Sequence, residues 1–166
     1  MKATEFRGAK LSATLALIKP DAYERGLVGQ IMMHMEDNFV VTDVLSSMWT
    51  REQASLFYIG HANKPFYQDL IDFMMSAPVT SVILVAPDAI PRWRGMLGYA
   101  DSRIAPRFSV RGQYGEKGDI IMRNAVHGSE TVNDFAREVP IAFTLSSGSS
   151  VLSDVLGSQY MRELTR

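Results

Sequence analysis

The sequence predicts an α+β fold, a ferredoxin-like four-stranded antiparallel sheet with helices packed on it. Short apolar runs rich in β-branched residues, which are typical of strands, alternate with segments whose apolar residues recur every three or four positions, which is typical of helices. Four strands are also too few to close a barrel with this much helix between them. We therefore expect a split βαβ arrangement with its helices on one face of the sheet.

Length and composition indicate one globular domain. The chain has 166 residues, 46% of them apolar and 21% charged. Its net charge of −1 argues against sequence-specific nucleic acid as a partner, because such binding needs a basic surface. The absence of cysteine excludes disulfides, thiolate catalysis and cysteine-type zinc sites. Without an apolar run of about 20 residues or a signal-peptide core, we expect no membrane partner and a cytoplasmic location, with a mitochondrial one left open.

Three segments are expected along the chain. Residues 1–12 are predicted to be a flexible lead-in, and residues 13–140 the folded domain. Residues 141–166 are predicted to be a linker and a short tail. Residues 146–150 read Ser-Ser-Gly-Ser-Ser, which is linker composition, and 151–166 could form a short amphipathic helix.

Four segments have the pattern of strands. The first, 14–18, is an apolar run that Pro20 stops. The second, 39–45, is rich in β-branched residues, and the third, 79–85, is the clearest buried strand in the chain. We expect the fourth at 119–123, which contains Ile-Ile-Met.

Helical patterns fill the intervals between these strands. Thr50 and Gln53 have the spacing of a capping box. Pro65 suits the first turn of a helix, and either Ser129 or Thr131 could cap the last one. Helices are expected at 26–36, from 50 through 58, from 65 to 74, from 88 to 97 and at 131–139. By contrast, residues 98–119 have little periodicity, and a loop of this length in a compact domain is often functional.

His127 is the first candidate for chemistry. It lies in the stretch 124–130, next to a glycine and a serine, and is expected at a strand end, where functional side chains collect. A lone histidine beside a serine and an acid is more often part of a capped turn. The cations Lys19, Arg94 and Arg111 favour chemistry instead. Clustered at a strand end they would bind a polyanion, because arginine offers a planar fork to phosphate oxygens.

A phosphate pocket with an uncharged imidazole inside suggests phosphoryl transfer. The imidazole would attack a terminal phosphoryl group and carry it covalently, with positioning and charge stabilisation doing most of the catalysis. Histidine suits this role because its neutral form dominates near pH 7. A carboxylate behind the ring would fix its tautomer, and Glu138 is the candidate.

Over roughly residues 13–140 the chain contains a series of short motifs whose order and spacing are very specific. They are Ile18-Lys19-Pro20-Asp21, Arg25-Gly26-Leu27-Val28-Gly29, Tyr58, His61, Lys64-Pro65-Phe66, Ser76-Ala77-Pro78-Val79, Arg94, Met96-Leu97-Gly98, Arg111-Gly112 and Arg123-Asn124-Ala125-Val126-His127-Gly128-Ser129. By these motifs the chain resembles the nucleoside diphosphate kinase family, as a divergent member.

The resemblance implies a catalytic group around a phosphorylated histidine. By it, His127 matches the phosphorylated residue, and Lys19 matches the lysine that reaches the transferring phosphoryl group. Tyr58 matches a hydroxyl near that group. Ser129 and Glu138 match the residues that hold the histidine and its surroundings.

The resemblance also implies a nucleotide site, a magnesium-nucleotide substrate and a ping-pong mechanism. The implied nucleotide-binding positions are Lys19, His61, Phe66, Arg94, Arg111 and Asn124. Phe66 matches the aromatic on which the base stacks, and Asn124 the amide that contacts the sugar hydroxyls. Mg²⁺ is expected on the nucleotide phosphates with no direct protein ligand. The family implies nucleoside di- and triphosphates as partners and a homo-oligomer.

The chain departs from the family pattern at several places. Ala100 occupies the position of a phosphate-contacting threonine, so one hydroxyl is missing, at a cost of roughly 1.5–3 kcal/mol for a lost hydrogen bond to a charged group. About three extra residues lie between Arg111 and Asn124. Glu130 replaces the usual acid after the serine, and the tail beyond 140 differs from the common ending.

Two other functions compete with the kinase. The first is a nucleotide-binding or partner-binding module of the same fold with weak or lost activity, which Ala100 and the insertion favour. The second is a Ser-His hydrolase that uses Ser129. It is disfavoured because side chains two positions apart rarely face each other and no G-x-S-x-G turn is present.

Overall fold

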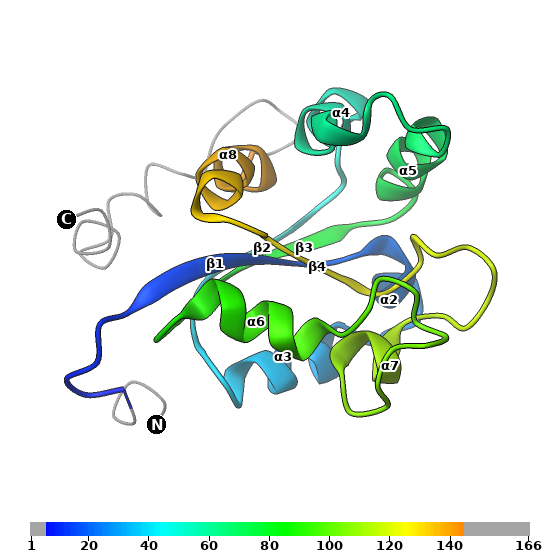
Figure 1. Ribbon diagram of the computed structural model, residues 1–166. Helices are drawn as coiled ribbons and strands as arrows, with labels where there is room; N and C mark the ends of the chain where they lie inside the picture. The colour runs from blue at the N-terminus through cyan, green and yellow to red at the C-terminus, as the bar shows by residue number, and fades with distance from the viewer. Residues whose placement is uncertain (1–5, 145–166) are drawn as a thin grey trace.

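The computed structural model describes residues 6–144 and contains the expected antiparallel sheet (Figure 1). Its strands lie in the order β2-β3-β1-β4, and every neighbouring pair is antiparallel. Their bounds are β1 Ser12–Ile18, β2 Val40–Ser47, β3 Val79–Ala86 and β4 Val126–Gly128. The predicted α+β, ferredoxin-like class is confirmed. The predicted linker at 146–150 and helix at 151–166 lie outside the described residues.

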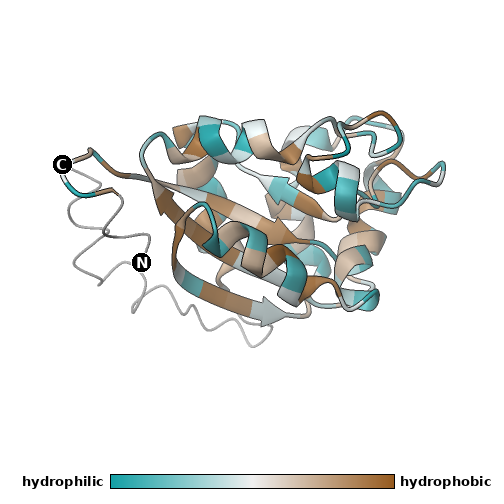
Figure 2. Ribbon diagram, turned by 90° about the horizontal axis from the view of Figure 1, so that it is seen from below, coloured by the Kyte–Doolittle hydropathy of each residue, from teal (hydrophilic) through white to brown (hydrophobic). Residues whose placement is uncertain are grey.

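Helices cover both faces of the sheet, so the expectation of one covered face is wrong (Figure 1). Helices α4, α5 and α8 bury apolar side chains in one cluster, and α2, α3, α6 and α7 in another. Strand β1 contributes side chains to both clusters. Leu15 and Leu17 point into the first cluster, and Ala16 and Ile18 point into the second. All of β3 is buried, and Figure 2 shows the strands as mainly apolar.

The helices begin close to their predicted positions. Thr50 and Gln53 form the predicted capping box at the start of α4. Thr131, rather than Ser129, caps α8 by accepting from the Asp134 amide. Phe66 precedes α5 and is exposed. The bounds are α2 Pro20–Glu24, α3 Val28–Glu36, α4 Arg51–Phe57, η1 Ile59–His61, α5 Tyr67–Met74, α6 Ala89–Leu97, α7 Val110–Tyr114 and α8 Val132–Ala142.

The predicted fourth strand at 119–123 is wrong. Ile120 and Ile121 are exposed in a turn that the Arg123 amide closes on the Ile120 carbonyl. The fourth strand is instead β4, three residues long, and it pairs with 16–18 of β1.

No helix within residues 6–144 is long and apolar enough to cross a membrane.

Candidate active site

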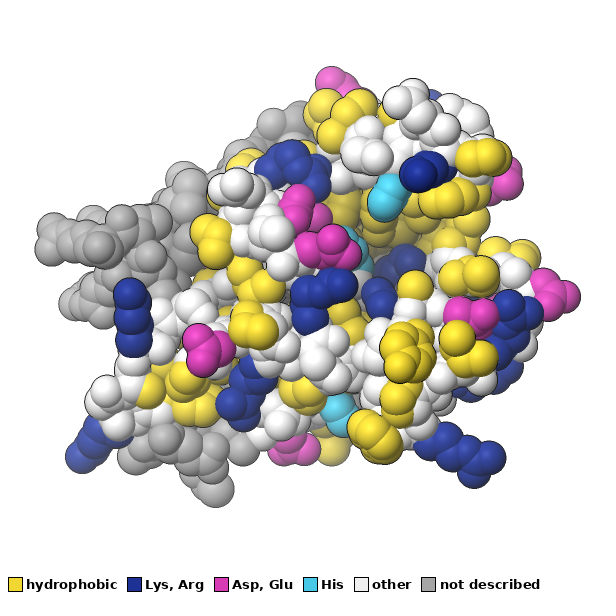
Figure 3. Space-filling view, viewed as in Figure 1, with side chains coloured by type: hydrophobic (Ala, Val, Ile, Leu, Met, Phe, Trp, Pro, Cys, Tyr) yellow, Lys and Arg dark blue, Asp and Glu magenta, His cyan; other side chains and the backbone are white. Residues whose placement is uncertain are grey.

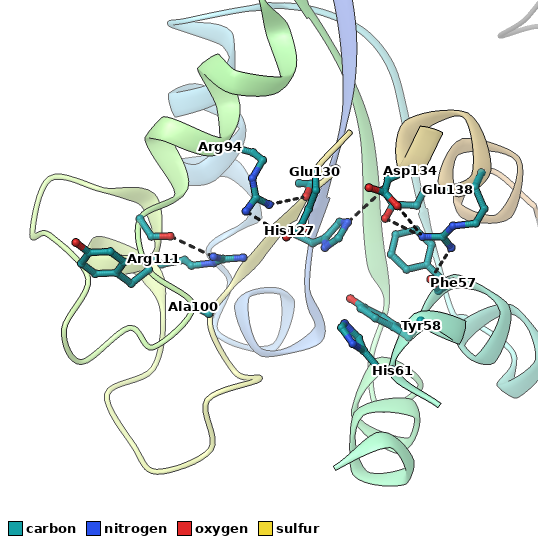
Figure 4. A pocket seen from close by; sticks show the side chains of 15 residues that line it. Phe57, Tyr58, His61, Arg94, Ala100, Arg111, His127, Glu130, Asp134 and Glu138 are labelled. Atoms are coloured by element: carbon teal, nitrogen blue, oxygen red, sulfur yellow. Dashed lines mark hydrogen bonds and ion pairs between the residues drawn. The ribbon is translucent and has the colours of Figure 1, made fainter. Parts of the chain in front are cut away.

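A cavity of about 530 Å³ opens beside β4. Basic side chains and a histidine gather around a hollow on the face shown in Figure 3. In Figure 4, Arg94 and Arg111 lie on one side of the cavity, Tyr58 and His61 on another, and His127 between them. The cavity is lined by Phe57, Tyr58, Gly60, His61, Arg94, Gly98, Tyr99, Ala100, Arg111, His127, Gly128, Glu130, Asp134, Arg137 and Glu138.

Strand alternation directs His127 toward α4 and α8. His127 pairs with Leu17 of β1, and cross-strand partners point to the same face. That face is the one that carries the α4 and α8 cluster. The neighbouring Gly128 faces the other layer, where an added Cβ would lie 2.5 Å from a Trp93 ring atom. The Trp93 indole N–H also donates to the His127 carbonyl at 3.1 Å, so α6 holds β4 on the face opposite to the imidazole.

The His127 ring is held by a buried carboxylate. Its Nε2 lies 3.3 Å from Glu138 Oε2. The same oxygen accepts a 2.6 Å hydrogen bond from the Ser129 hydroxyl. Phe57 packs edge-on against the imidazole with ring centroids 5.2 Å apart. The ring is therefore fixed on one side while 19% of the side chain stays exposed toward the cavity.

Ser129 has no access to a substrate in this arrangement. Its side chain is fully buried, and its hydroxyl donates to Glu138. A nucleophilic serine needs a base beside its oxygen and an open approach. The hydrolase alternative is therefore not supported by the geometry.

Two arginines form the basic wall of the cavity. Arg111 donates to the Gly98 and Val126 carbonyls, both at 3.2 Å. Burial and the charge of Arg94 lower the pKa of Arg111 to about 10, so its guanidinium remains charged at neutral pH. Arg94 is more exposed and pairs with Glu130 at 3.2 Å.

Lys19 and Asn124 lie behind this wall and do not line the cavity. The Lys19 ammonium donates to the Met122 carbonyl at 2.6 Å and to Asn124 Oδ1 at 2.9 Å. Burial lowers the pKa of Lys19 to about 7, against the attraction of Asp21. Asn124 in turn donates to the Ala100 carbonyl at 2.9 Å, which links the lysine to the long loop.

Tyr58, His61 and Phe66 form an aromatic row. The rings of Tyr58 and His61 stack with centroids 6.0 Å apart, and His61 lies 6.0 Å from Phe66. The Tyr58 hydroxyl donates to the Met74 sulfur at 3.7 Å. Burial, followed by the charge of Glu138, raises the pKa of Tyr58, so the hydroxyl stays protonated. Phe66 does not line the cavity, and 44% of its surface is exposed.

Ala100 lies in the cavity wall with no side-chain hydroxyl to offer there. Sequence reasoning missed Asp134 and Arg137, which also line the cavity. Arg137 donates to the Phe57 carbonyl at 2.8 Å and lies 3.4 Å from Glu138 Oε1. Because Asp134 precedes Glu138 by four positions, helical spacing could have placed both on one face of α8.

The arrangement suits the transfer of a charged group to or from His127. It combines an oriented imidazole, a buried carboxylate behind it and two guanidinium groups beside it. Charges fixed before a reaction begins stabilise charge that develops during it. The cavity is also large enough for a small ligand.

A model of the family described as nucleoside diphosphate kinase matches residues 12–147. A nucleoside diphosphate kinase of Hyperthermus butylicus is 38% identical over 132 residues, which are 79% of this chain and 91% of that protein. A nucleoside diphosphate kinase homolog 7 of Rattus norvegicus is 39% identical over 145 residues, covering 85% of this chain and 35% of its own length. The chain therefore spans about a third of that relative.

Solved structures show the same likeness. A nucleoside diphosphate kinase of Aquifex aeolicus superposes with a TM-score of 0.74 at 34% identity, covering 81% of this chain and 96% of the other. One from Encephalitozoon cuniculi also gives 0.74, at 26% identity, covering 83% of this chain and 90% of the other.

Proposed function

Because this chain belongs to the nucleoside diphosphate kinase family, we propose that it transfers the γ-phosphoryl group of a nucleoside triphosphate to a nucleoside diphosphate through a phosphorylated His127. Members of this family are phosphotransferases that bind nucleotides and use a divalent metal ion. The observation that carries the proposal is the contact of His127 Nε2 with Glu138 inside a cavity walled by arginines.

The nitrogen that attacks is Nδ1. Glu138 occupies Nε2 and favours the tautomer that carries its proton there, which leaves the lone pair on Nδ1. This pair forms a bond to the γ-phosphorus while the bond from that phosphorus to the bridging oxygen breaks, and the nucleoside diphosphate leaves. In the second half-reaction a terminal phosphate oxygen of the acceptor forms the new bond, and the phosphorus–nitrogen bond breaks.

Charges around the histidine stabilise the transferring group. Arg94 and Arg111 each offer a planar set of donors suited to phosphate oxygens. The partly exposed ring becomes cationic as it is phosphorylated, and the Glu138 carboxylate offsets that charge. Lys19 reaches the phosphoryl group after exchanging its contact with the Met122 carbonyl for a phosphate oxygen.

The aromatic row binds the nucleoside. Phe66, which precedes α5, offers an exposed ring face on which a base can stack. Stacking does not discriminate strongly among bases because each base has a π-face. Asn124, which is buried beside Lys19 behind the cavity wall, contacts the sugar hydroxyls after giving up its bond to the Ala100 carbonyl.

The divalent ion is Mg²⁺ carried by the nucleotide phosphates. Within residues 6–144, no group of three or more histidine, aspartate or glutamate side chains is placed to hold a metal ion. The cavity carboxylates Glu130 and Asp134 are paired with Arg94 and Arg137. This donor set fits an ion that arrives on phosphate oxygens, where it would neutralise charge on the transferring group.

The transfer assay tests this function with a matched pair of variants. The parent should move phosphate from ATP to several nucleoside diphosphates with ping-pong kinetics. His127→Ala should lose this activity, whereas His34→Ala should keep it, because His34 lies on α3 and does not line the cavity. Transfer by His127→Ala at the parent's rate would overturn the assignment.

A nucleotide-binding module with weak activity is the second candidate, and Ala100 favours it. The same assay separates the two, since a module would bind nucleotide in equilibrium measurements without transferring phosphate.

The chain is also proposed to form a homo-oligomer. Ile104 and Phe108 on the long loop are 69% and 82% exposed, and exposed apolar side chains that cluster are typical of contact surfaces.

A further inference from the structure

The backbone turns sharply between Asn124 and His127. Ala125, between them, has a φ of +70°, in the left-handed region that residues other than glycine rarely adopt. This residue separates the side chain that binds Lys19 from the strand that presents the histidine. A residue held in this conformation persists only where its surroundings fix it.

Two groups on the segment after β1 fix Ala125. The Lys19 amide donates to the Ala125 carbonyl at 2.8 Å, and the Ala125 amide donates to Asp21 Oδ2 at 2.9 Å. The Asp21 side chain is fully buried, and its other oxygen has no hydrogen-bond partner among the described residues. Burial, the largest influence, raises the pKa of Asp21, while Lys19, the Ala125 amide and Arg25 oppose it.

We propose that Asp21 is a positioning residue whose carboxylate, by holding the Ala125 amide, sets the place of His127 for attack on the phosphoryl group. The inference rests on the proposed function. Asp21 does not line the cavity. It acts through the turn, two residues before the histidine.

A competing role for Asp21 lies in a chain of ion pairs. Asp21 accepts from Arg25 at 3.2 Å, and Arg25 lies 3.7 Å from Glu116, which pairs with Arg123 at 2.8 Å. These pairs join α2 to the loop that contains the extra residues. Arg25, Glu116 and Arg123 are partly exposed, and such pairs contribute little to stability.

Three variants distinguish the positioning of Ala125 by Asp21 from the role of Asp21 in the chain of ion pairs. Asp21→Ala removes the acceptor, Asp21→Asn keeps an acceptor oxygen without the charge, and Arg25→Gln breaks the ion-pair chain but leaves the Ala125 bond. The measured quantities are the single-turnover rate of His127 phosphorylation by ATP and the dissociation constant for ATP. Rates are compared below neutral pH, because Lys19 has a pKa of about 7 and the Asp21 charge favours its protonated form.

We expect Asp21→Ala to phosphorylate His127 about 30- to 100-fold more slowly, because small displacements of a reacting group cost about this much. Its affinity for ATP should stay within about threefold of the parent, as expected for misplacement of the nucleophile alone. Asp21→Asn should recover most of the rate, and Arg25→Gln should match the parent. Parent-like phosphorylation by Asp21→Ala, or an equal loss in Arg25→Gln or Asp21→Asn, overturns the proposal.

A second measurement does not depend on activity. Hydrogen exchange of the Ala125 amide, followed by NMR without nucleotide, should be slow in the parent and in Asp21→Asn. In Asp21→Ala it should be at least about tenfold faster. If Asp21→Ala does not fold, unprotected exchange at Ala125 in the parent or in Asp21→Asn would contradict the proposal. A parent that forms no phosphohistidine would refute the proposed function, while the exchange data still decide the role of Asp21.

Discussion

Glu138 connects His127 to the rest of the protein. One of its oxygens serves both the imidazole and Ser129, and the other lies near Arg137. This contact spans eleven positions of sequence, and no periodicity in the sequence indicated it. Glu138 was a candidate because a carboxylate behind the ring would fix its tautomer, and the family resemblance implied the same residue. Glu138 is buried, so little water screens the charge of its carboxylate.

Glu138→Gln should slow phosphorylation of His127 by about ten- to a hundredfold while ATP affinity stays nearly unchanged. The amide keeps the size of the side chain, but the charge that stabilises the cationic ring in the transition state is gone. Single-turnover kinetics measure the rate, and equilibrium binding measures the affinity. Glu130→Gln is the control, because Glu130 pairs with Arg94 and does not contact the imidazole. Equal single-turnover rates in parent and Glu138→Gln would refute this role.

The Lys19 pKa of about 7 predicts a pH dependence. In the free enzyme the ammonium loses its proton as pH rises through this value, so kcat/KM for ATP should fall above neutrality. Lys19→Arg should lack this fall, whatever its absolute rate, because a guanidinium keeps its proton. A parent profile that stays flat across mildly alkaline pH would contradict the assignment of Lys19.

Ala100→Thr tests the missing hydroxyl. If the new side chain reaches the phosphate, the transfer rate should rise by up to about tenfold, which corresponds to about 1.4 kcal/mol. Ala100→Val, which has the same shape without the hydroxyl, should give no increase. An equal rate in Ala100→Thr and Ala100→Val would show that the loop backbone directs this side chain away from the phosphate.

The strands were predictable to different degrees. Residues 82–86 form an unbroken apolar run, and β3 is indeed buried along its whole length. Such a run indicates burial on both faces, so helices on both sides could have been predicted from it. Strand β4 could not be predicted from the sequence, because three residues are too few to show a periodic pattern. The more apolar run at 120–122 looks more like a strand, but it is a turn that leaves Ile120 and Ile121 exposed.

Helix α4 depends on its cap and on its contact with α8. The Thr50 hydroxyl accepts from the Gln53 amide at 3.1 Å, while the Gln53 side chain donates to the Ile141 and Thr144 carbonyls. Thr50→Ala should lower the free energy of unfolding by about 1 kcal/mol. Gln53→Ala should cost about 2 kcal/mol or more, because two further carbonyls lose donors. Urea denaturation measures the free energy of unfolding of both variants, and Thr50→Ser is the control that keeps the cap. Equal stability of the parent and Thr50→Ala would contradict the role of the Thr50 cap.

The cavity forms where the two helical layers meet the open edge of the sheet. Its histidine comes from the edge strand, its carboxylate from α8 in one layer, and Arg94 from α6 in the other. Arg94 and Arg111, which are far apart in sequence, both line the cavity beside the histidine, whereas Lys19 lies behind the cavity wall. Arg137 was not anticipated, since nothing in the local sequence indicates its contact with the α4 carbonyls.

Self-association would cover the exposed apolar side chains of the long loop. Native mass measurement should therefore give a multiple of the 18.5 kDa chain. Phe108→Glu should shift the mass toward the monomer, because a charge in an apolar contact is costly. Thr42→Ser, at an exposed position of β2, should leave the assembly unchanged. A monomeric parent at working concentrations would refute the proposed assembly.

The most direct measurement is isolation of the phosphorylated protein. After incubation with γ-labelled ATP and no acceptor, we predict one label per chain, stable in alkali, labile in acid and located on the peptide that contains His127. Adding a nucleoside diphosphate should release the label as the triphosphate, and His127→Ala should take up none. An unlabelled protein that still transfers phosphate, or a label on any other residue, would contradict the phosphohistidine mechanism.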